Sequence, residues 1–585
     1  MPEPVIKIED LSFSYQGDQK ALKNISLEVA EGEYLAIVGA NGAGKTTLCL
    51  FMNGIIPNVI GGRVSGSVIV GGINTFDYHV YDIAQQVGLV LQDPESQLFA
   101  ADVTSEIAFA AENRGIAREI IIPRLAEAVR IVRLSGLEDR LSDELSGGQK
   151  QRLAIAANLV VQPNILVADE PTSQLDPIGK EQVFATLAEL NKNEKMTVVI
   201  ASHDVDEIER YADRVIVLDE GKIILSGPPA EVFREIKTLD RIYVHVPDLA
   251  RLGNTLGINK GQPLSLDVNK AAEQLRAWIK KNKGTGAAEK IVIPAGSSVK
   301  STGTRDTALG KGIAVKVDHL TFQYPGTLSP AIMDIDVEIK EGEFIGLIGQ
   351  NGSGKTTLMK CLVGLLKPQK GAVMINEKPI AGQKVGVIAA QIGLILQNPD
   401  TQLFAMSVQE EIEFGLANLN LSETELKERV DEALKITSLE DFRGLYPFKL
   451  SLGDRRKVAV ASIVAMRPPI LIFDEPLTGQ DYKGRYELTN MAADLHRDGH
   501  TVIMISHDME LVAQYTQRTL VLGMGMVLLD APTREVFNHV DLLHSTYIEP
   551  PEIIRLAQAL CPDCLPSNLL TVEEVTRALL DTIKQ

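Results

Sequence analysis

The sequence predicts an α/β chain made of two similar halves, each with a mostly parallel sheet core. Long stretches occur twice in the same order: "YLAIVGANGAGKTTL" (34–48) returns as "FIGLIGQNGSGKTTL" (344–358), and "ILVADEPTSQLD" (165–176) returns as "ILIFDEPLTGQD" (470–481). The interval is nearly constant, because Lys45 and Lys355 are 310 residues apart and His203 and His507 are 304 apart. Such self-similarity indicates a duplicated domain. Within each half, short apolar runs alternate with helical patterns, as in a parallel sheet.

The elements of the first half follow from these runs. "YLAIVG" is a short apolar run that ends in glycine, as a buried strand does. "TTLCLFMNG" follows as a helix closed by Gly54. "ILVAD", "TVVIAS" and "RVIVLD" predict further buried strands, separated by helix-like segments. The second half repeats this order.

The repeat continues beyond the sheet into a small appendage on each half. "VPDLARLGNTL" (246–256) is echoed by "PPEIIRLAQAL" (550–560), and a helical pattern follows each. Residues 282–312 are rich in Gly, Ser, Thr and Lys, which predicts a flexible linker. We therefore expect a first domain at 1–240, its appendage at 241–281, the linker at 282–312, a second domain at 313–545 and its appendage at 546–585.

Composition and charge narrow the functional classes. The net charge is −19 and no long Lys/Arg block occurs, so nucleic-acid binding is not expected. No run of about 20 apolar residues is present, and the N-terminus lacks an apolar signal-peptide core. We expect a cytoplasmic chain, for which any membrane-spanning part would come from another subunit.

Each half carries a phosphate-binding motif of the form G-x-x-x-x-G-K-[ST] after a strand and before a helix. Glycines allow backbone N–H groups to surround a phosphate chain, and the lysine neutralises it. Thr46 and Thr356 would hold Mg²⁺, so ATP and Mg²⁺ are the expected ligands. The predicted phosphate-binding residues are Gly39, Ala40, Asn41, Gly42, Ala43, Gly44, Lys45, Thr46 and Thr47, and Gly349, Gln350, Asn351, Gly352, Ser353, Gly354, Lys355, Thr356 and Thr357.

Acidic residues and a histidine follow two later strands of each half. Asp169 and Asp474 end apolar runs, where a carboxylate can reach Mg²⁺. The adjacent Glu170 and Glu475 would polarise the attacking water as general bases. His203 and His507 occur in a repeated Ser-His-Asp and are expected to contact the γ-phosphate.

This set of motifs resembles the ATP-binding-cassette (ABC) ATPases over nearly the whole chain, twice. The resemblance implies two P-loop domains, each with a helical signature subdomain. It also implies a Q-loop role for Gln92 and Gln397, which would sense Mg²⁺ and the membrane partner. Asp176 and Asp481 resemble the D-loop aspartate. Tyr15 and Tyr324 match the aromatic residue that stacks on adenine.

The ABC signature motif is present as "LSGGQ" (145–149) and in altered form as "LSLGD" (450–454). In the family this motif begins a helix and meets the nucleotide held by the other cassette, so the resemblance implies head-to-tail pairing within this chain. Lys45, Glu170 and His203 would then work with Ser451 and Gly453. Lys355, Glu475 and His507 would work with Ser146, Gly148 and Gln149. We expect the site with the intact motif to hydrolyse ATP faster; tolerated drift with two active sites is the alternative.

The stretches "LQDPESQLFA" and "LQNPDTQLFA" resemble the Q-loop region of energy-coupling-factor (ECF) transporter ATPases. That group drives uptake of vitamins or of cobalt and nickel ions, with a transmembrane coupling protein and a substrate-binding membrane subunit. The resemblance places the chain at the cytoplasmic face of the membrane. Leu98-Phe99 and Leu403-Phe404 would be apolar anchors for a coupling helix, unless they belong to the core. Four nearby acids would pair with arginines of that helix: Glu95, Glu106, Asp400 and Glu410.

A soluble double-cassette ATPase of translation or DNA repair is the alternative function. The Gly/Ser/Thr-rich linker, the negative charge and the absence of long heptad repeats disfavour it.

Overall fold

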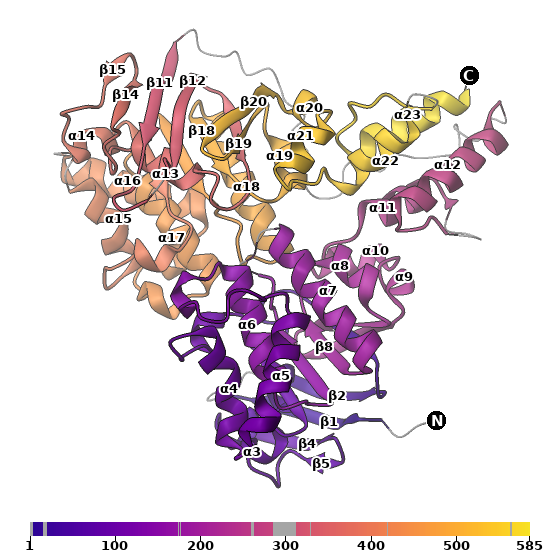
Figure 1. Cartoon of the computed structure of the whole chain (residues 1–585). Coiled ribbons are helices and arrows are strands. Elements are labelled where there is room, and N and C mark those ends of the chain that lie inside the picture. Colours follow the sequence, from indigo (N-terminus) through magenta and orange to yellow (C-terminus); the bar gives the residue numbers. More distant parts are fainter. Residues whose placement is uncertain are drawn as a thin grey trace. The chain divides into compact units, whose positions relative to one another are not determined.

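The computed structural model describes residues 4–15, 20–173, 175, 177–258, 263–284, 312–327, 329–417, 419, 421–561 and 564–584. The chain divides into two compact units (Figure 1). One unit contains Met1–Arg251 and Asp481–Lys483, and the other contains Leu252–Gln480 and Gly484–Gln585. Most of the predicted linker and the D-loop residue Asp176 lie outside the described residues. The domain boundaries given above remain a prediction.

The predicted parallel sheet forms in the first cassette and has six strands in the order β10-β9-β3-β8-β7-β6. Only β10 runs antiparallel to its neighbour. Every residue of β3, β7 and β8 is buried, which explains their unbroken apolar sequences. The strands are β3 (Tyr34–Val38), β6 (Val87–Val90), β7 (Ile165–Asp169), β8 (Thr197–Ala201), β9 (Arg214–Asp219) and β10 (Lys222–Gly227).

A second sheet, which the sequence did not predict, is antiparallel and has the order β2-β1-β4-β5. Its strands are β1 (Ile6–Ser14), β2 (Lys20–Val29), β4 (Arg63–Val70) and β5 (Ile73–Asn74). In β2 buried and exposed residues alternate, as expected for a sheet with one solvated face. The buried face packs on α1 (Lys45–Met52) and the parallel sheet to form one core.

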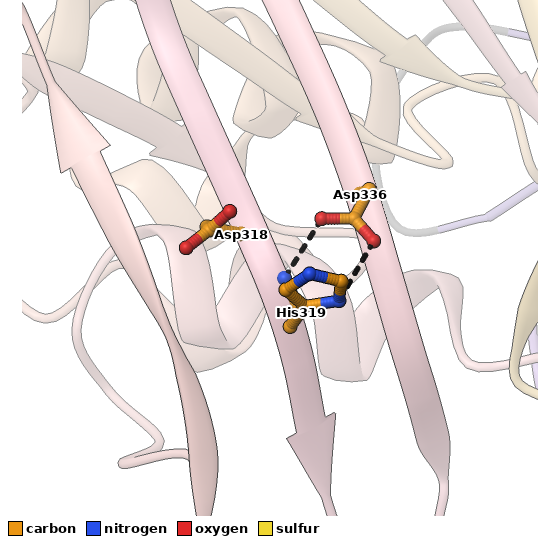
Figure 2. Close-up of side chains that lie close together, drawn as sticks. All are labelled: Asp318, His319 and Asp336. Atoms are coloured by element: carbon orange, nitrogen blue, oxygen red, sulfur yellow. Dashed lines mark hydrogen bonds and ion pairs between the residues drawn. The ribbon is translucent and has the colours of Figure 1, made fainter.

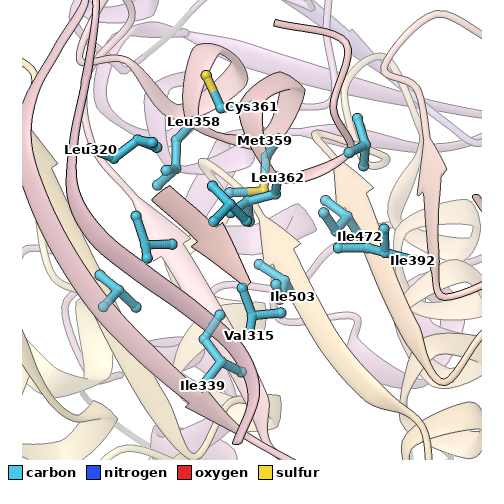
Figure 3. Packing of buried hydrophobic residues seen from close by; sticks show 14 of the residues in the cluster. Val315, Leu320, Ile339, Leu358, Met359, Cys361, Leu362, Ile392, Ile472 and Ile503 are labelled. Carbon is cyan, nitrogen blue, oxygen red and sulfur yellow. The ribbon is translucent and has the colours of Figure 1, made fainter. Parts of the chain in front are cut away.

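The second cassette repeats both sheets (Figure 1). The six-stranded sheet contains β13 (Phe344–Ile348), β16 (Ile392–Ile395), β17 (Ile470–Asp474), β18 (Thr501–Ile505), β19 (Arg518–Gly523) and β20 (Met526–Pro532). The antiparallel sheet contains β11 (Ile313–Phe322), β12 (Ile332–Lys340), β14 (Lys370–Ile375) and β15 (Lys378–Pro379). Figure 3 shows the core between them, which contains Leu358 and Met359 of α13 (Lys355–Leu362) together with Val315, Ile472 and Ile503 of the strands.

Each cassette also has a helical part after its Q-loop glutamine. In the first it contains α4 (Val103–Asn113), α5 (Arg118–Ile131) and α6 (Gly147–Leu159). In the second it contains α15 (Val408–Leu416), α16 (Glu423–Thr437) and α17 (Leu452–Val464). Apolar residues of the second set form a separate cluster that includes Leu403, Val408 and Ile412. The helices α7 (Pro177–Glu194), α8 (Val205–Tyr211), α18 (Tyr482–Arg497) and α19 (Met509–Tyr515) accompany the parallel sheets.

The appendages consist of α11 (Asp248–Thr255) and α12 (Val268–Asn282), and of α22 (Glu552–Leu560) and α23 (Val572–Lys584). Within the second unit α12 packs against α22 and α23. The Gly284 N–H donates to the Ile583 carbonyl at 2.9 Å. Among the described residues, no helix has the length and apolar character needed to cross a bilayer.

Candidate functional site

The P-loops are shaped by glycines whose backbone a side chain would not allow. Gly44 has φ of 106° and stands immediately before α1. A Cβ there would lie 2.8 Å from the Ala21 carbonyl oxygen. The equivalent Gly354 has φ of 102°, and its Cβ would lie 2.5 Å from the Ala331 carbonyl oxygen. Only glycine fits these positions, at the start of a helix where backbone N–H groups can bind an anion.

The P-loop lysines are buried inside their loops. Lys45 is only 4% exposed, and its ammonium group donates to the carbonyls of Gly39 at 2.9 Å and Ala40 at 3.2 Å. The Lys355 ammonium group donates to the carbonyls of Gly349 at 2.7 Å and Gln350 at 3.0 Å. Each loop therefore places a desolvated positive charge where an anionic phosphate chain would gain most from it.

Glu170 contacts three predicted residues beside the first P-loop. Its Oε1 atom lies 2.9 Å from His203 Nε2 and 3.2 Å from Lys45 Nζ, and its Oε2 atom lies 3.5 Å from Gln92 Nε2. Burial by itself raises the pKa of Glu170, but the hydrogen bond and charge of His203 and the charge of Lys45 outweigh it. The net effect lowers the pKa to about 2, so the carboxylate is ionised.

Glu475 has the equivalent partners beside the second P-loop. Its Oε1 atom lies 2.9 Å from His507 Nε2 and 4.0 Å from Lys355 Nζ, and its Oε2 atom lies 3.3 Å from Gln397 Nε2. Burial again opposes ionisation. The pKa of Glu475 is nevertheless lowered, because the hydrogen bond and charge of His507 and the charge of Lys355 outweigh burial. Both glutamates have positive φ, 47° for Glu170 and 46° for Glu475. Such backbone strain is typical of functional sites.

Asp169 and Asp474 are buried and fit a cation. The Oδ1 atom of each has no hydrogen-bond partner among the described residues. Burial raises the pKa of both to about 6, and a hydrogen bond from Thr46 or Thr356 opposes this shift. Mg²⁺ prefers oxygen ligands, and a carboxylate beside a threonine hydroxyl supplies them. Gln92 and Gln397, which are also expected to sense Mg²⁺, contact Glu170 and Glu475 in the structure, and their role toward the metal stays a prediction.

Predicted asparagines and tyrosines also lie beside these residues. The side-chain oxygens of Asn41 and Asn351 lie 3.3 Å and 3.1 Å from Nε2 of His203 and His507. The Tyr15 hydroxyl lies 3.0 Å from Thr47 Oγ1, and the Tyr324 hydroxyl lies 3.3 Å from Thr357 Oγ1.

Tyr15 and Tyr324 are 39% and 37% exposed, which leaves ring surface for a base to stack on. The structure thus brings the predicted P-loop residues together, while their roles in ATP turnover remain predictions.

The two signature motifs begin their helices differently. Ser146 caps α6, and its Oγ accepts the Gln149 N–H at 3.3 Å, while Gln149 Oε1 accepts the Ser146 N–H at 2.9 Å. Ser451 caps α17 and its Oγ accepts the Asp454 N–H at 3.1 Å. The Ser451 hydroxyl also donates to Asp454 Oδ2 at 2.7 Å.

The Q-loop regions expose aromatic pairs. Phe99 is 64% exposed and meets Phe109 edge-on, with ring centroids 4.3 Å apart. Phe404 is 58% exposed and meets Phe414 in the same way at 4.5 Å. The prediction that Leu403 is a surface anchor is wrong, because Leu403 is 4% exposed and packs in the helical core.

The acids near these aromatics already have partners within the chain. The buried Glu106 carboxylate accepts the N–H groups of Phe99 at 3.0 Å and Ala100 at 2.6 Å. The prediction that Glu106 pairs with an arginine of a partner is therefore wrong, since burial and these bonds occupy it. Its equivalent in the second cassette is Glu411, which the sequence reasoning missed. Glu411 accepts the N–H groups of Phe404 and Ala405 at 2.9 and 2.8 Å.

The other three acids are exposed but not free. Glu95 forms an ion pair with Lys150 at 2.5 Å, and Asp400 forms one with Arg455 at 3.0 Å. Glu410 accepts the Met406 N–H at 3.2 Å. In both cassettes, the ion pair joins the Q-loop region to the signature helix.

A further group of potential metal ligands lies away from the P-loops, on β11 and β12. Figure 2 shows Asp318, His319 and Asp336, all of them exposed. Asp336 Oδ1 accepts the backbone N–H of His319, a residue with φ of 47° at an irregular point of β11. In the first cassette, Ser26 Oγ binds the N–H of Asp10, which has φ of 46°. In both cassettes a side chain of the neighbouring strand therefore accepts the N–H of a residue with positive φ, and Asp336 has this role in the second cassette.

Comparison with known proteins agrees with this geometry. The ABC transporter family model matches residues 22–173 and 332–478. An ABC transporter ATP-binding protein of Methanosarcina mazei is 37% identical over 95% of this chain and 93% of its own length. One from Caldanaerobacter subterraneus subsp. tengcongensis is 39% identical over 97% of this chain and 98% of its own length.

Among solved structures, cbiO1 from Clostridium perfringens, part of the ABC transporter complex cbiONQ, is 33% identical. It covers 42% of this chain and 98% of its own, with a TM-score of 0.37. The family match and the two relatives that align over nearly the full length of both chains decide the assignment. The chain belongs to the ABC transporter ATP-binding proteins and contains two ABC-type P-loop ATPase domains.

Proposed function

We propose that this chain is the ATP-hydrolysing energy-coupling subunit of an ECF-type importer at the cytoplasmic face of the membrane. It would drive uptake of a vitamin or a transition-metal ion through a transmembrane coupling protein and a substrate-binding membrane subunit. The observation that carries the proposal is the pair of exposed aromatics after each Q-loop glutamine, Phe99 with Phe109 and Phe404 with Phe414. Exposed apolar groups of this kind mark interaction sites.

The architecture around each aromatic pair supports docking. A buried carboxylate, Glu106 or Glu411, binds two successive backbone N–H groups and fixes the loop that turns its phenylalanine outward. A rigid aromatic anchor loses little side-chain entropy when a partner covers it. The coupling protein would supply an apolar helix for each pair.

The side chains around each P-loop lysine suit hydrolysis of the γ-phosphate. Glu170 and Glu475 are ionised and would accept a proton from the attacking water. In the structure Lys45 and His203 share the Glu170 Oε1 atom. A bound phosphate chain would compete for both of these side chains and so free this oxygen to act as a base. Mg²⁺ held by Thr46 and Asp169, and by Thr356 and Asp474, would neutralise phosphate charge.

Head-to-tail pairing of the two cassettes completes the proposal. Lys45, Glu170 and His203 would form one site with Ser451 and Gly453, and Lys355, Glu475 and His507 would form the other with Ser146, Gly148 and Gln149. Each signature serine caps a helix of 13 residues, and such helix starts favour anions.

A pull-down of the tagged chain from its native membranes in mild detergent tests the proposal. We expect a polytopic coupling protein and a small membrane subunit in stoichiometric amounts, identified by mass spectrometry. The variant F99A/F109A/F404A/F414A should lose both partners and keep its ATPase activity. The matched control M524A/Y547A removes side chains that are 73% and 58% exposed, and it should keep both partners.

The same experiment weighs the alternative of a soluble double-cassette ATPase. The comparisons favour the transporter class, because the relatives that align over most of the chain carry transporter names. Recovery with ribosomes, or without any membrane protein, would contradict the importer and return the aromatic pairs to a role in packing.

A further inference from the structure

The altered signature motif differs from the intact one in where its serine hydroxyl hydrogen goes. Ser451 donates it to the Asp454 carboxylate at 2.7 Å. In the intact motif Gln149 binds the Ser146 backbone N–H instead of the hydroxyl. Within the described part of the chain, the Ser146 hydroxyl donates to no other group. Its hydrogen is therefore free for a ligand, while that of Ser451 is not.

The bond between Ser451 and Asp454 is of the stronger kind. A hydroxyl has a single hydrogen to donate, and a carboxylate can only accept. A charge-assisted hydrogen bond is roughly twice as strong as a neutral one. The Ser451 oxygen is also occupied, because it accepts the Asp454 N–H at 3.1 Å. To donate to a phosphate, Ser451 would first have to break its bond to Asp454.

A lysine lies near the Asp454 carboxylate. Lys457 lies 4.0 Å from Asp454 Oδ1 and 2.6 Å from Glu487 Oε2. Lys457 is thus near Oδ1, whereas the Ser451 hydroxyl donates to Oδ2 of the same carboxylate. The carboxylate would also add a negative charge beside a bound polyanion.

The second change in the motif, Leu452 in place of a glycine, carries less weight. At the equivalent Gly147 an added Cβ would lie 3.7 Å from the nearest atom, Leu175 Cδ2, an ordinary contact distance. The motif also keeps its second glycine, Gly453. A Cβ at this position therefore meets no close contact within the described residues, and we assign the larger effect to the loss of a hydrogen-bond donor.

We propose that Asp454 is a positioning residue that withholds the Ser451 hydroxyl from ATP and slows the site formed by Lys45, Glu170 and His203. This inference rests on the head-to-tail pairing in the proposed function. It assigns the difference between the two sites to one carboxylate, and it makes that difference reversible by a single substitution. Glutamine fits at this position of the helix, as Gln149 shows.

The test uses the purified full chain with one site inactivated at a time. In the E475Q background only the Lys45 site turns over, and we expect D454Q to raise its ATPase rate by about tenfold. In the E170Q background only the Lys355 site turns over. There the effect of D454Q on the rate should be at least about fivefold smaller than in the E475Q background. The control L452G in the E475Q background should raise the rate much less than D454Q does.

Replacing the signature serine tests whether Ser451 is a hydrogen-bond donor withheld from ATP or only caps its helix. S451A should cost the E475Q variant little compared with what S146A costs the E170Q variant, about tenfold or more. After D454Q is introduced, S451A should become as costly as S146A. The proposal is overturned if D454Q leaves the E475Q rate unchanged, or if S451A is already as costly as S146A with Asp454 in place.

Failure of the underlying pairing gives a different result. If S146A slows the E475Q variant and spares the E170Q variant, each signature serves its own cassette. The head-to-tail proposal then fails, whatever D454Q does.

Discussion

The two cassettes place the same side chains around their P-loop lysines but begin their signature helices with different hydrogen bonds. His203 and His507 lie at the same 2.9 Å from Glu170 and Glu475. The positive φ of both glutamates and the raised pKa of Asp169 and Asp474 are also shared. The signatures differ because Asp454 accepts the hydroxyl hydrogen of its serine and Gln149 does not.

If the proposed pairing holds, this contrast would let the two sites differ without any change in their predicted catalytic residues. The P-loop residues, glutamates and histidines are intact in both halves, which would suggest equal activity. Under head-to-tail pairing, the altered signature acts on the nucleotide of the other cassette. A cassette in which all of these residues are intact can therefore hydrolyse its ATP more slowly than the other.

The largest effect on stability is expected where the cassettes agree, at the buried acids behind the aromatic pairs. E106A and E411A would each leave two backbone N–H groups without an acceptor. We expect each to lower the free energy of unfolding by about 2–3 kcal/mol, since an unsatisfied buried donor costs about 1–3 kcal/mol. Urea unfolding of the full chain measures this. E106Q and E411Q keep an acceptor oxygen and should cost less; a neutral effect of E106A alone would break the equivalence of the two loops.

Substitution of the buried Asp169 and Asp474 should instead raise the free energy of unfolding. The pKa of Asp169 and Asp474 is raised to about 6 by burial, so the ionised form costs stability above that pH. D169N and D474N should each stabilise the protein without ligand by about 2 kcal/mol at pH 7. The gain should disappear as pH falls toward the ordinary aspartate pKa, about 4, because the acid is then protonated in both states. Thermal unfolding at the two pH values checks this, and a gain that persists in acid would contradict the assignment.

The same raised pKa predicts how both sites depend on Mg²⁺. One pH unit below a pKa of about 6, roughly a tenth of each aspartate is ionised. The Mg²⁺ concentration for half-maximal ATPase activity should therefore rise about tenfold between pH 7.5 and pH 5. Titrations of E170Q and E475Q should shift equally. Unequal shifts would place the difference between the sites in the residues around the P-loops instead of in the signatures.

The smallest expected effects are at the ion pairs between the Q-loop region and the signature helix. E95Q removes the pair with Lys150, in which Glu95 is 67% exposed, and D400N removes the pair with Arg455, in which Asp400 is 37% exposed. Exposed pairs contribute about 0–1 kcal/mol. We expect D400N to be the more destabilising, because both Asp400 oxygens lie 3.0 Å from Arg455 Nη1. Chemical denaturation resolves this ranking, and the reverse order would contradict it.

The sequence predicted the parallel sheets and the family because the residues that define them are contiguous. A P-loop, an Asp-Glu pair after a strand and a Ser-His-Asp are each readable in a few residues. The roles assigned to the individual site residues still await the experiments above.

The antiparallel sheets, the burial of Leu403 and the inward turn of Glu106 could not be predicted in this way. They depend on packing between segments that are distant in sequence or on which face of a helix is covered. The bond between Ser451 and Asp454 is local, however, and a serine followed by an acid three residues later at a helix start could have indicated it.

The central claim is that the site completed by the intact signature hydrolyses ATP faster than the site completed by the altered one. ATP hydrolysis by the E170Q and E475Q variants of the full chain tests it most directly. The account predicts that E475Q loses at least about tenfold more activity than E170Q. Equal losses in the two variants would contradict it.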